Sequence, residues 1–280
     1  MRVVPKVCLT IGGSDSGGGA GIQADIKTFS ALGLHGASAI TAITAQNTLG
    51  VKQVFGLDNE AVSSQIRAVL EDLDIACAKT GMLHSAEVVS TVAEILGKSE
   101  ISLVLDPVIE AEAGGRLLRP DAVDCLKAEL IPLARVVTPN IFEARALTGI
   151  EVNDLKSAKQ AALEIQDMGP KAVIVKGGHL DCTDLVLEKG EVYLIKGSRI
   201  QGGNHGVGCS YSAAVASFLG MGCDLIEAAS KAKTFAAEAV SNSFDVGHGP
   251  GPVNQAGALR KEASKYRALF KPEESRDSGF

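Results

Sequence analysis

A cysteine that follows closely spaced glycines is the feature of the sequence most suggestive of chemistry. Cys209 lies in the segment Gly202–Gly220, where a glycine-rich turn leads into a run of small residues that predicts a helix. Around Gly206 and Gly208, the free N–H groups and the positive dipole of the helix N-terminus would form an anion hole for a phosphoryl group in transfer. We expect this field to lower the pKa of the Cys209 thiol, so that it could accept a proton near neutral pH. The alternative is a small packing residue at a tight turn.

A second glycine-rich segment, Gly12–Gly21, follows a predicted strand and opens a predicted helix. It lacks the Lys-Ser/Thr pair of a P-loop and the clean GxGxxG spacing of a dinucleotide site. Glycines in such a turn let the backbone approach a ligand closely. Because the segment also holds Ser14 and Asp15, a binding loop is a better interpretation than a flexible turn.

Oxygen and ammonium groups follow other predicted strands. Asn140 and Glu143 are spaced to share one face at a strand-to-helix junction and could bind hydrated Mg²⁺. The alternative is a capping box, which is favoured if nothing else supports a metal. Asp106 could also serve Mg²⁺, and Lys176 could contact a phosphate as a point charge. Either residue alone is equally well explained as a polar strand end.

Short apolar runs alternate with amphipathic stretches along the chain. The predicted strands are Val7–Ile11, Ala37–Thr44, Asp74–Thr80, Ser102–Pro107, Arg135–Asn140 and Lys171–Gly178, with a β-hairpin over Asp184–Lys196. The predicted helices begin near Ile22, Asn59, Ser85, Leu155, Gly208 and Leu225. Unbroken apolar strands between helices predict an α/β fold with a parallel sheet covered on both faces. Ligands bind at the carboxyl ends of such strands, where the segments above fall.

Length, charge and cysteine spacing limit the class of protein. We predict one domain over residues 1–270 and a disordered tail over residues 271–280. The net charge of -6 and the pI near 5.5 argue against a nucleic-acid partner. No stretch approaches the length of a membrane span. The six cysteines show no CxxC pair, which predicts free thiols in the reducing cytoplasm.

Taken in order, these segments resemble the hydroxymethylpyrimidine and phosphomethylpyrimidine kinases of thiamine biosynthesis, in the ribokinase-like superfamily. The matches reach to about residue 255, and the SDSGGGAGIQAD stretch is the most specific. The matching stretches are Leu9–Gly33, Ser38–Val51, Lys79–Leu83, Leu105–Val108, Val137–Ala144, Val175–His179, Asn204–Ala214 and Val246–Val253. The resemblance implies a ribokinase-like fold with a central, mostly parallel sheet and helices on both faces. It also implies a homodimer, with ATP·Mg²⁺ as the phosphate donor.

The resemblance implies a role for particular residues on the substrate side. Gly13 and Gln46 are expected to bind the pyrimidine, and Asp25 to stabilise that pocket. Met82 and Val108 are expected to line it.

On the donor side, the resemblance implies that Asn140 and Glu143 organise Mg²⁺ and that Lys176 faces the nucleotide. Gly206 and Gly208 are expected to form the anion hole. Cys209 takes the place of the catalytic base, which is an Asp in the wider superfamily.

The chain departs from the usual HGTGCT pattern of the family at two positions. Val207 loses a hydroxyl that would contact a nucleotide phosphate, whereas Ser210 keeps a hydroxyl. The anion hole depends on backbone N–H groups, so the change need not abolish it.

The expected activity is ATP-dependent phosphorylation of the hydroxymethyl group of hydroxymethylpyrimidine, and of the monophosphate to the pyrophosphate. One alternative is a pyridoxal or pyridoxine kinase, which shares the fold and much of the motif set. Gln46 favours the aminopyrimidine, because its amide can both donate to and accept from adjacent ring N and NH₂ groups. The other alternative is a non-catalytic pyrimidine sensor, to which Val207 alone points.

Overall fold

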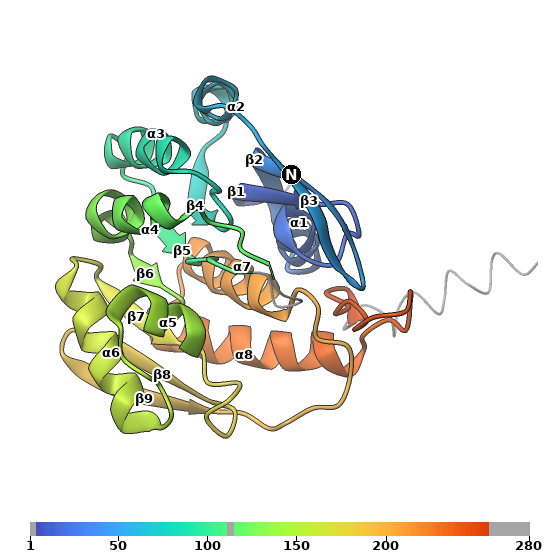
Figure 1. The fold of residues 1–280 in the computed structure, drawn as a ribbon, viewed down its shortest axis with the longest axis vertical. Coiled ribbons are helices and arrows are strands. Elements are labelled where there is room, and N and C mark those ends of the chain that lie inside the picture. Colours follow the sequence, from blue (N-terminus) through green and yellow to red (C-terminus); the bar gives the residue numbers. More distant parts are fainter. Residues whose placement is uncertain (1–3, 111–114, 258–280) are drawn as a thin grey trace, which may run out of the picture.

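The computed structural model describes residues 4–110 and 115–257, which form a nine-stranded sheet in the order β3-β2-β1-β4-β5-β6-β7-β8-β9 (Figure 1). The strands are β1 (Val7–Asp15), β2 (His35–Asn47), β3 (Gly50–Gly56), β4 (Ile75–Thr80), β5 (Leu103–Leu105), β6 (Val136–Val137), β7 (Ala172–Val175), β8 (Thr183–Glu188) and β9 (Glu191–Lys196). The helices are α1 (Gly21–Ala31), α2 (Asn59–Asp72), α3 (Ala86–Gly97), α4 (Pro120–Cys125), α5 (Ile141–Thr148), α6 (Leu155–Asp167), α7 (Val207–Gly220) and α8 (Leu225–Ser241).

The six central strands, from β2 to β7, are parallel, and the strands at the two edges are antiparallel. All six parallel strands therefore present their carboxyl ends along one edge of the sheet. The turn Lys189-Gly190 closes the predicted hairpin β8–β9.

Alternate residues of the strands enter two separate cores, as strand geometry requires. Leu9, Leu105 and Val173 belong to the core beneath α2, α3, α4 and α6. Cys8 and Val104 belong to the core beneath α1, α7 and α8, on the opposite face. The buried, β-branched strands of this two-sided sheet explain why the sequence shows continuous apolar runs.

The predicted fold class is confirmed, and the differences lie in the boundaries. β1 continues through Gly12 and Gly13 to Asp15, so only Ser16–Ala20 is loop. β3 and the helical turns of Pro120–Leu133 lacked a clear pattern and were missed. The single domain over residues 1–270 stays a prediction, and the predicted tail lies outside the described residues. Within residues 4–110 and 115–257, no helix is both long and apolar enough to cross a membrane.

Among the α-helices in the described residues, α1, α4 and α7 have no side-chain cap, and the other five have one. The caps are Asp58 for α2, Ser85 for α3, Asn140 for α5, Asp154 for α6 and Asp224 for α8. The N-cap of α7 is Gly206, which has no side chain to accept a hydrogen bond. The N-terminal N–H groups of α7 therefore have no side-chain acceptor from their own cap.

Candidate active site

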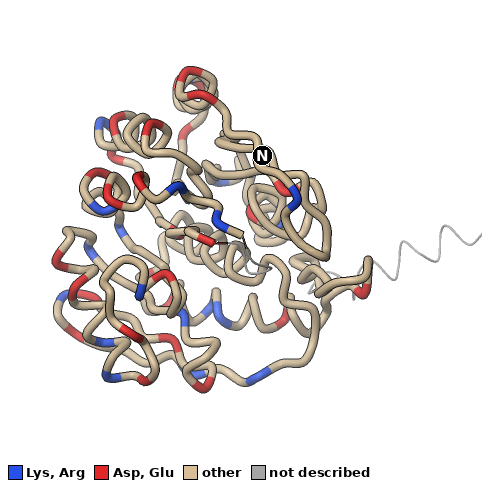
Figure 2. The backbone as a smooth tube through the Cα atoms, viewed as in Figure 1, with Lys and Arg blue, Asp and Glu red and all other residues tan. Residues whose placement is uncertain are grey.

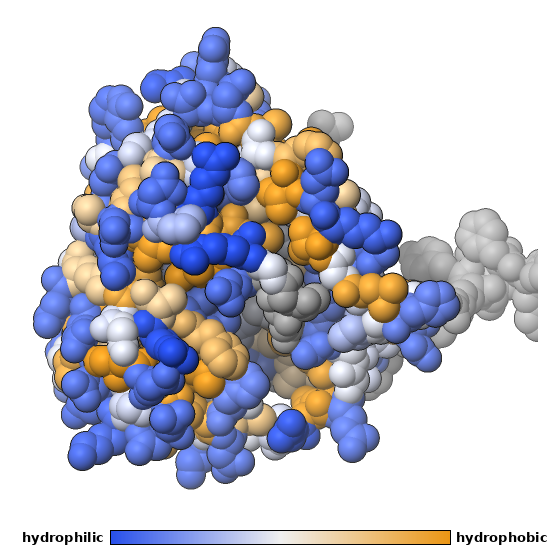
Figure 3. Space-filling model, viewed as in Figure 1, coloured by the Kyte–Doolittle hydropathy of each residue, from blue (hydrophilic) through white to orange (hydrophobic). Residues whose placement is uncertain are grey.

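The predicted site residues gather at the carboxyl edge of the sheet. Gly13 is in β1, Gln46 ends β2, Met82 follows β4, Asp106 and Val108 follow β5, Asn140 follows β6, and Lys176 follows β7. The N-terminus of α7 brings Gly206, Val207, Gly208 and Cys209 to the same edge (Figure 1). In Figure 3, strongly hydrophilic side chains gather near the middle of the visible face, beside apolar surface. In Figure 2, acidic and basic residues are interspersed along the backbone.

Lys176 is the centre of a cluster of opposite charges. Its Nζ lies 2.7 Å from Oδ1 of Asp106 and 3.7 Å from Oε2 of Glu143. The hydroxyl of Ser212 donates to the other oxygen of Asp106 at 2.9 Å. Burial raises the pKa of Glu143 to about 7, and the Asp106 carboxylate adds to this, although the Lys176 ammonium opposes it. Two carboxylates thus share one ammonium, which leaves the cluster short of positive charge.

The structure bears out the capping alternative for Asn140. Its Oδ1 accepts from the N–H groups of Phe142 and Glu143 at 2.9 and 2.8 Å. In return, the N–H of Asn140 donates to Oε2 of Glu143 at 2.7 Å. The amide oxygen thus accepts two hydrogen bonds in the cap, and the role of Asn140 as a metal ligand stays a prediction. Its NH₂ group has no partner in this capping box and is the part of the side chain that could reach a ligand.

The remaining carboxylates fit Mg²⁺ only in part. Asp106 and Glu143 supply the oxygen ligands that Mg²⁺ prefers, and both surround a cation already. Among the described residues, no group of three or more His, Cys, Asp or Glu side chains could hold a metal. The residues fit an ion that keeps several waters and relies on substrate phosphates, rather than an all-protein cage.

Gly206 is required by the approach of two loops. It has φ of +84°, and a Cβ there would lie 1.8 Å from the carbonyl oxygen of Gly19. The turn before α7 therefore packs against the loop before α1, and only glycine fits. A Cβ on Gly208 would lie 3.6 Å from Nζ of Lys176, so the open helix N-terminus and the ammonium face the same space.

Cys209 lies in the first turn of α7 as expected, but the expected lowering of its pKa is wrong. Burial raises the pKa of its thiol to about 11. The Lys79 ammonium opposes this rise, and the carboxylates of Asp25 and Asp106 add to it. The N–H of Gly21 at the start of α1 also favours the thiolate. The helix dipole acts on this thiol, but desolvation and two carboxylates outweigh it.

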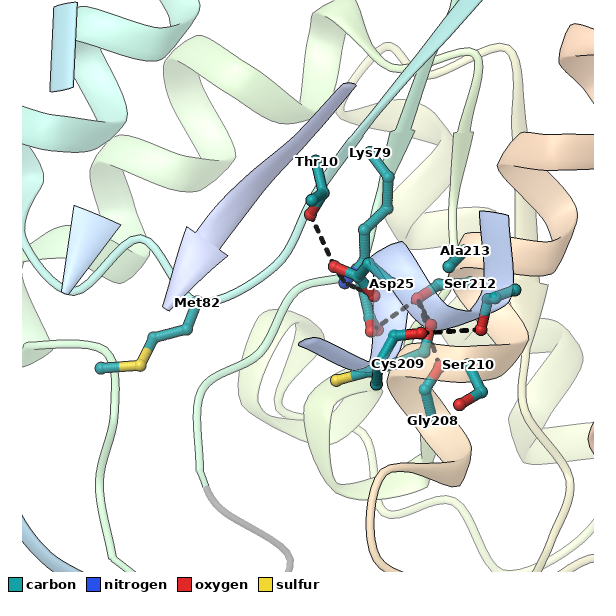
Figure 4. Close-up of polar contacts among 12 residues, drawn as sticks. Thr10, Asp25, Lys79, Met82, Gly208, Cys209, Ser210, Ser212 and Ala213 are labelled. Carbon is teal, nitrogen blue, oxygen red and sulfur yellow. Dashed lines mark hydrogen bonds and ion pairs between the residues drawn. The ribbon is translucent and has the colours of Figure 1, made fainter. Parts of the chain in front are cut away.

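A second lysine–aspartate pair lies deeper, beside Cys209 (Figure 4). Nζ of Lys79 is 3.0 and 2.9 Å from the two oxygens of Asp25, and the Thr10 hydroxyl donates to Asp25 at 2.6 Å. Both side chains of the pair are 1% exposed. Sequence reasoning assigned no role to Lys79. A lysine inside the apolar run DIACAKT was the signal that could have found it, because buried lysines need a partner.

The other end of the site carries amide, hydroxyl and imidazole groups. A Cβ on Gly13 would meet Sδ of Met82 at 2.8 Å, so Met82 covers this glycine. Gln46 is half-buried, with its Oε1 3.1 Å from the Thr44 hydroxyl and its Nε2 3.5 Å from Nε2 of His205. Sequence reasoning assigned no role to His205, since the sequence gives this histidine no metal-ligand spacing.

Two predicted residues contribute little polar chemistry. Val108 is half-buried, and its N–H donates to the Asp106 carbonyl at 2.8 Å. Val207 is half-buried at the start of α7 and presents no hydroxyl.

The mostly parallel sheet, with a lysine, carboxylates and an uncapped helix N-terminus at its carboxyl edge, defines a phosphotransferase of the ribokinase-like fold. The family model described as phosphomethylpyrimidine kinase matches residues 15–254, and the chain belongs to this family.

Named relatives agree with this assignment. The chain is similar to a hydroxymethylpyrimidine/phosphomethylpyrimidine kinase of Rhizobium meliloti, with 48% identity over 89% of this chain and 96% of the relative. A crystal structure of phosphomethylpyrimidine kinase from Clostridium difficile covers 84% of this chain and 99% of its own, with 43% identity and a TM-score of 0.75. The pyridoxal kinase of Staphylococcus aureus in complex with AMP-PCP and pyridoxal covers 91% and 96%, with 34% identity and a TM-score of 0.83. The predicted family and the predicted kinase class are confirmed.

Proposed function

We propose that the protein transfers the γ-phosphoryl group of ATP to the hydroxymethyl oxygen of hydroxymethylpyrimidine, and then phosphorylates the monophosphate to the pyrophosphate. In a chain of this family, the supporting observation is that groups suited to a phosphoryl group and groups suited to a pyrimidine ring lie at the same edge of the sheet. Lys176 and the open N-terminus of α7 form a phosphoryl end, and Gln46 forms a ring-reading end.

The phosphoryl end stabilises charge rather than supplying a covalent partner. Phosphoryl transfer spreads charge over the equatorial oxygens of a loose transition state. Lys176 and the N–H groups around Gly206–Cys209 are directed at one space, where they offset this charge. We expect the NH₂ group of Asn140 and the backbone at Val207 to contact the nucleotide.

Mg²⁺ would be held by Asp106 and Glu143 and would neutralise charge on the nucleotide phosphates when bound. Lys176 keeps these two carboxylates together before the nucleotide arrives. Asn140 fixes the Glu143 backbone and carboxylate through the capping box.

Cys209 takes the hydroxyl proton late in the transfer. With a pKa of about 11, only roughly one thiol in 10⁴ is ionised at pH 7. A minor thiolate is still effective, because it is a strong base and a loose transition state asks for proton removal only when the new P–O bond forms. The Lys79 ammonium and the Gly21 N–H hold the charge that the thiolate carries.

On the substrate side, Gln46 and the backbone at Gly13 bind the ring, and Met82 and Val108 cover it. Asp25 supports this pocket from below through Thr10 and Lys79. The similarity to a pyridoxal kinase that binds AMP-PCP and pyridoxal makes pyridoxal the second candidate substrate. Gln46 favours the aminopyrimidine, whose adjacent acceptor and donor match both ends of an amide.

A non-catalytic pyrimidine sensor would have no use for the phosphoryl end. The retention of Asp106, Glu143, Lys176 and Cys209 in one cluster argues for catalysis. An ATPase assay with and without hydroxymethylpyrimidine separates the two, because a sensor shows no stimulation.

The central test is mass spectrometry of the products after incubation with ATP·Mg²⁺ and hydroxymethylpyrimidine, or with pyridoxal, in parallel. We expect the monophosphate and then the pyrophosphate of the pyrimidine. Turnover of pyridoxal alone would replace this function with the second candidate, and no transfer to either would contradict both.

We also propose that the enzyme is a homodimer in the cytoplasm. All six cysteines are unpaired in the structure, which suits a reducing compartment. The dimer rests on the family resemblance, and sedimentation equilibrium tests it.

A further inference from the structure

His205 contacts an early segment of the chain through its ring and a late segment through its backbone. Its N–H donates to the carbonyl of Gly251 at 3.3 Å, and its carbonyl accepts from the N–H of Val253 at 3.1 Å. Its ring lies against the loop before α1, since a Cβ on Gly19 would come within 2.1 Å of its Cδ2. The imidazole therefore has little freedom to turn away from its neighbours.

The Asp15 carboxylate fixes which imidazole nitrogen carries a proton. Oδ2 of Asp15 lies 3.0 Å from Nε2 of His205 and also accepts from the N–H groups of Gly19 and Ala20. Burial alone would raise the pKa of Asp15, but the hydrogen bonds from His205, Ala20 and Gly17 lower it below its usual range. An ionised carboxylate only accepts, so Nε2 of His205 must be a donor in either charge state of the ring.

This assignment conflicts with an amide nitrogen of Gln46 on the side of His205. Nε2 of Gln46, a donor, faces Nε2 of His205 at 3.5 Å, so two donors oppose each other. At Thr44 the mismatch is the reverse: its hydroxyl faces two acceptors, the Ser14 carbonyl at 3.0 Å and Oε1 of Gln46 at 3.1 Å. The amide thus turns its donor toward a donor and its acceptor toward a proton that already has another acceptor.

A rotation of the amide by about 180° gives every one of these donors an acceptor. Oε1 of Gln46 then faces the His205 Nε2–H and shares that proton with Oδ2 of Asp15 in a three-centre hydrogen bond. The amide nitrogen donates to the Thr44 hydroxyl oxygen, and the Thr44 hydroxyl donates to the Ser14 carbonyl. Every donor in the chain Asp15–His205–Gln46–Thr44 then has an acceptor.

We propose that His205 is a specificity-determining positioning residue: its Nε2–H, fixed by Asp15, holds the Gln46 amide with oxygen toward the histidine and nitrogen toward Thr44. This rests on the proposed function, in which Gln46 reads the ring. The fixed amide offers its remaining acceptor and donor in one order only. An aminopyrimidine edge, with a donor NH₂ beside an acceptor nitrogen, then fits this amide in one orientation only.

A double-mutant cycle tests whether His205 acts through Gln46. His205→Phe keeps a ring against Gly19 and removes the donor, and we expect kcat/KM for hydroxymethylpyrimidine to fall roughly 10- to 100-fold with KM for ATP unchanged. In a Gln46→Leu background, the same change should cost less than about twofold, because there is no amide left to orient. Additive losses would mean that His205 acts independently of Gln46 and would overturn the proposal.

Matched variants separate orientation from packing. His205→Gln restores an N–H donor near the position of Nε2 and should recover most of the loss, whereas His248→Phe, at an exposed histidine, should be silent. His205→Phe should also narrow the preference for the pyrimidine over the same ring without its amino group. An unchanged preference would contradict the inference even if activity fell.

The wild-type protein offers a readout that needs no activity and no variant. Long-range ¹H–¹⁵N correlation spectra should show Nε2 of His205 protonated at neutral pH. An unprotonated Nε2 would overturn the proposed amide orientation outright. If the wild type fails to phosphorylate the pyrimidine, the proposed function fails, while this spectrum still decides the orientation.

Discussion

The two lysine–aspartate pairs of the site differ in how completely they are closed. Lys79 and Asp25 are both 1% exposed and hold each other through two contacts, with one hydroxyl to complete the carboxylate. Lys176 is 14% exposed and is shared between Asp106 and Glu143. The first pair is a fixed, neutral unit, and the second has a carboxylate in excess. Lys79 and Asp25, the closed pair, therefore support the site from within. Lys176 and Asp106, the open pair together with Glu143, can exchange a contact for a ligand.

The largest effect is expected from breaking the closed pair. Lys79→Met leaves the Asp25 carboxylate buried without its cation, which typically costs about 3–5 kcal/mol of folding free energy. Lys176→Met should cost much less stability, because Glu143 can take up a proton and Asp106 keeps the Ser212 hydroxyl. Urea unfolding of both variants measures the contrast. Adding Asp25→Asn to Lys79→Met should recover stability, and equal losses in the two single variants would erase the distinction between the pairs.

The charges of Lys79 and Asp25 influence the pKa of Cys209, so its activity tests this pair. Cys209→Ala should keep both substrates bound and lower kcat by about two to four decades. Because the pKa of the thiol is about 11, single-turnover rates of the wild type should rise as the pH increases from 7 toward 10. Cys209→Asp should retain partial activity and lose this rise, since a carboxylate is already ionised at pH 7. Wild-type turnover by Cys209→Ala would reduce the residue to packing.

Alkylation offers an independent check of the same pKa. A lowered pKa would have made Cys209 the most reactive of the six thiols at neutral pH, and the raised pKa predicts slow labelling that accelerates above pH 9. ATP·Mg²⁺ with the pyrimidine should protect it. Mass spectrometry of iodoacetamide-treated peptides at several pH values measures the order of labelling.

The open pair should make stability depend on pH. Glu143 ionises near 4.5 in the unfolded chain and near 7 in the folded protein. Between these values the unfolded chain has released a proton that the folded protein keeps, so rising pH favours unfolding, by on the order of 3 kcal/mol in total. The loss should begin near pH 4.5 and level off about one pH unit above 7.

Glu143→Gln should remove this pH dependence while its amide oxygen keeps the capping bond to the Asn140 N–H. Its kcat should fall and its Mg²⁺ requirement should rise. Thermal melts from pH 4 to 9 and Mg²⁺ titrations of the activity measure both. Early melting with an unaltered Mg²⁺ curve would show that Glu143 serves only the cap.

The smallest effect is expected from Val207, at the start of α7. Val207→Thr restores a hydroxyl at the start of α7, and one added hydrogen bond to a phosphate is worth about 0.5–1.5 kcal/mol. We therefore expect KM for ATP to fall by roughly 2- to 10-fold, with KM for the pyrimidine unchanged. Serine at the same position should give part of the gain. No change for either variant would mean that the position does not face the nucleotide.

Local sequence patterns predicted what depends on local physics. The apolar runs, the glycine turns and the Asn140–Glu143 spacing each express one strand, one turn or one cap, and the structure has them. The pKa of Cys209 depends on Lys79, Asp25 and Asp106, which come from three other parts of the chain. His205 acquires its partners from residues about 190 positions away. No spacing rule encodes such contacts, because the fold alone brings them together.

The contact between Gly19 and Gly206 also sets the order in which the enzyme can mature on the ribosome. The loop before α1 leaves the ribosome early, but the turn that completes the site follows only after most of the chain has been synthesised. At about 5–20 residues per second, the first strands wait roughly ten seconds or longer for α7. During that time the sheet face that carries Cys8 and Cys77 is covered by α1 but lacks α7 and α8. Nascent chains of this protein should therefore engage holding chaperones until α7 emerges.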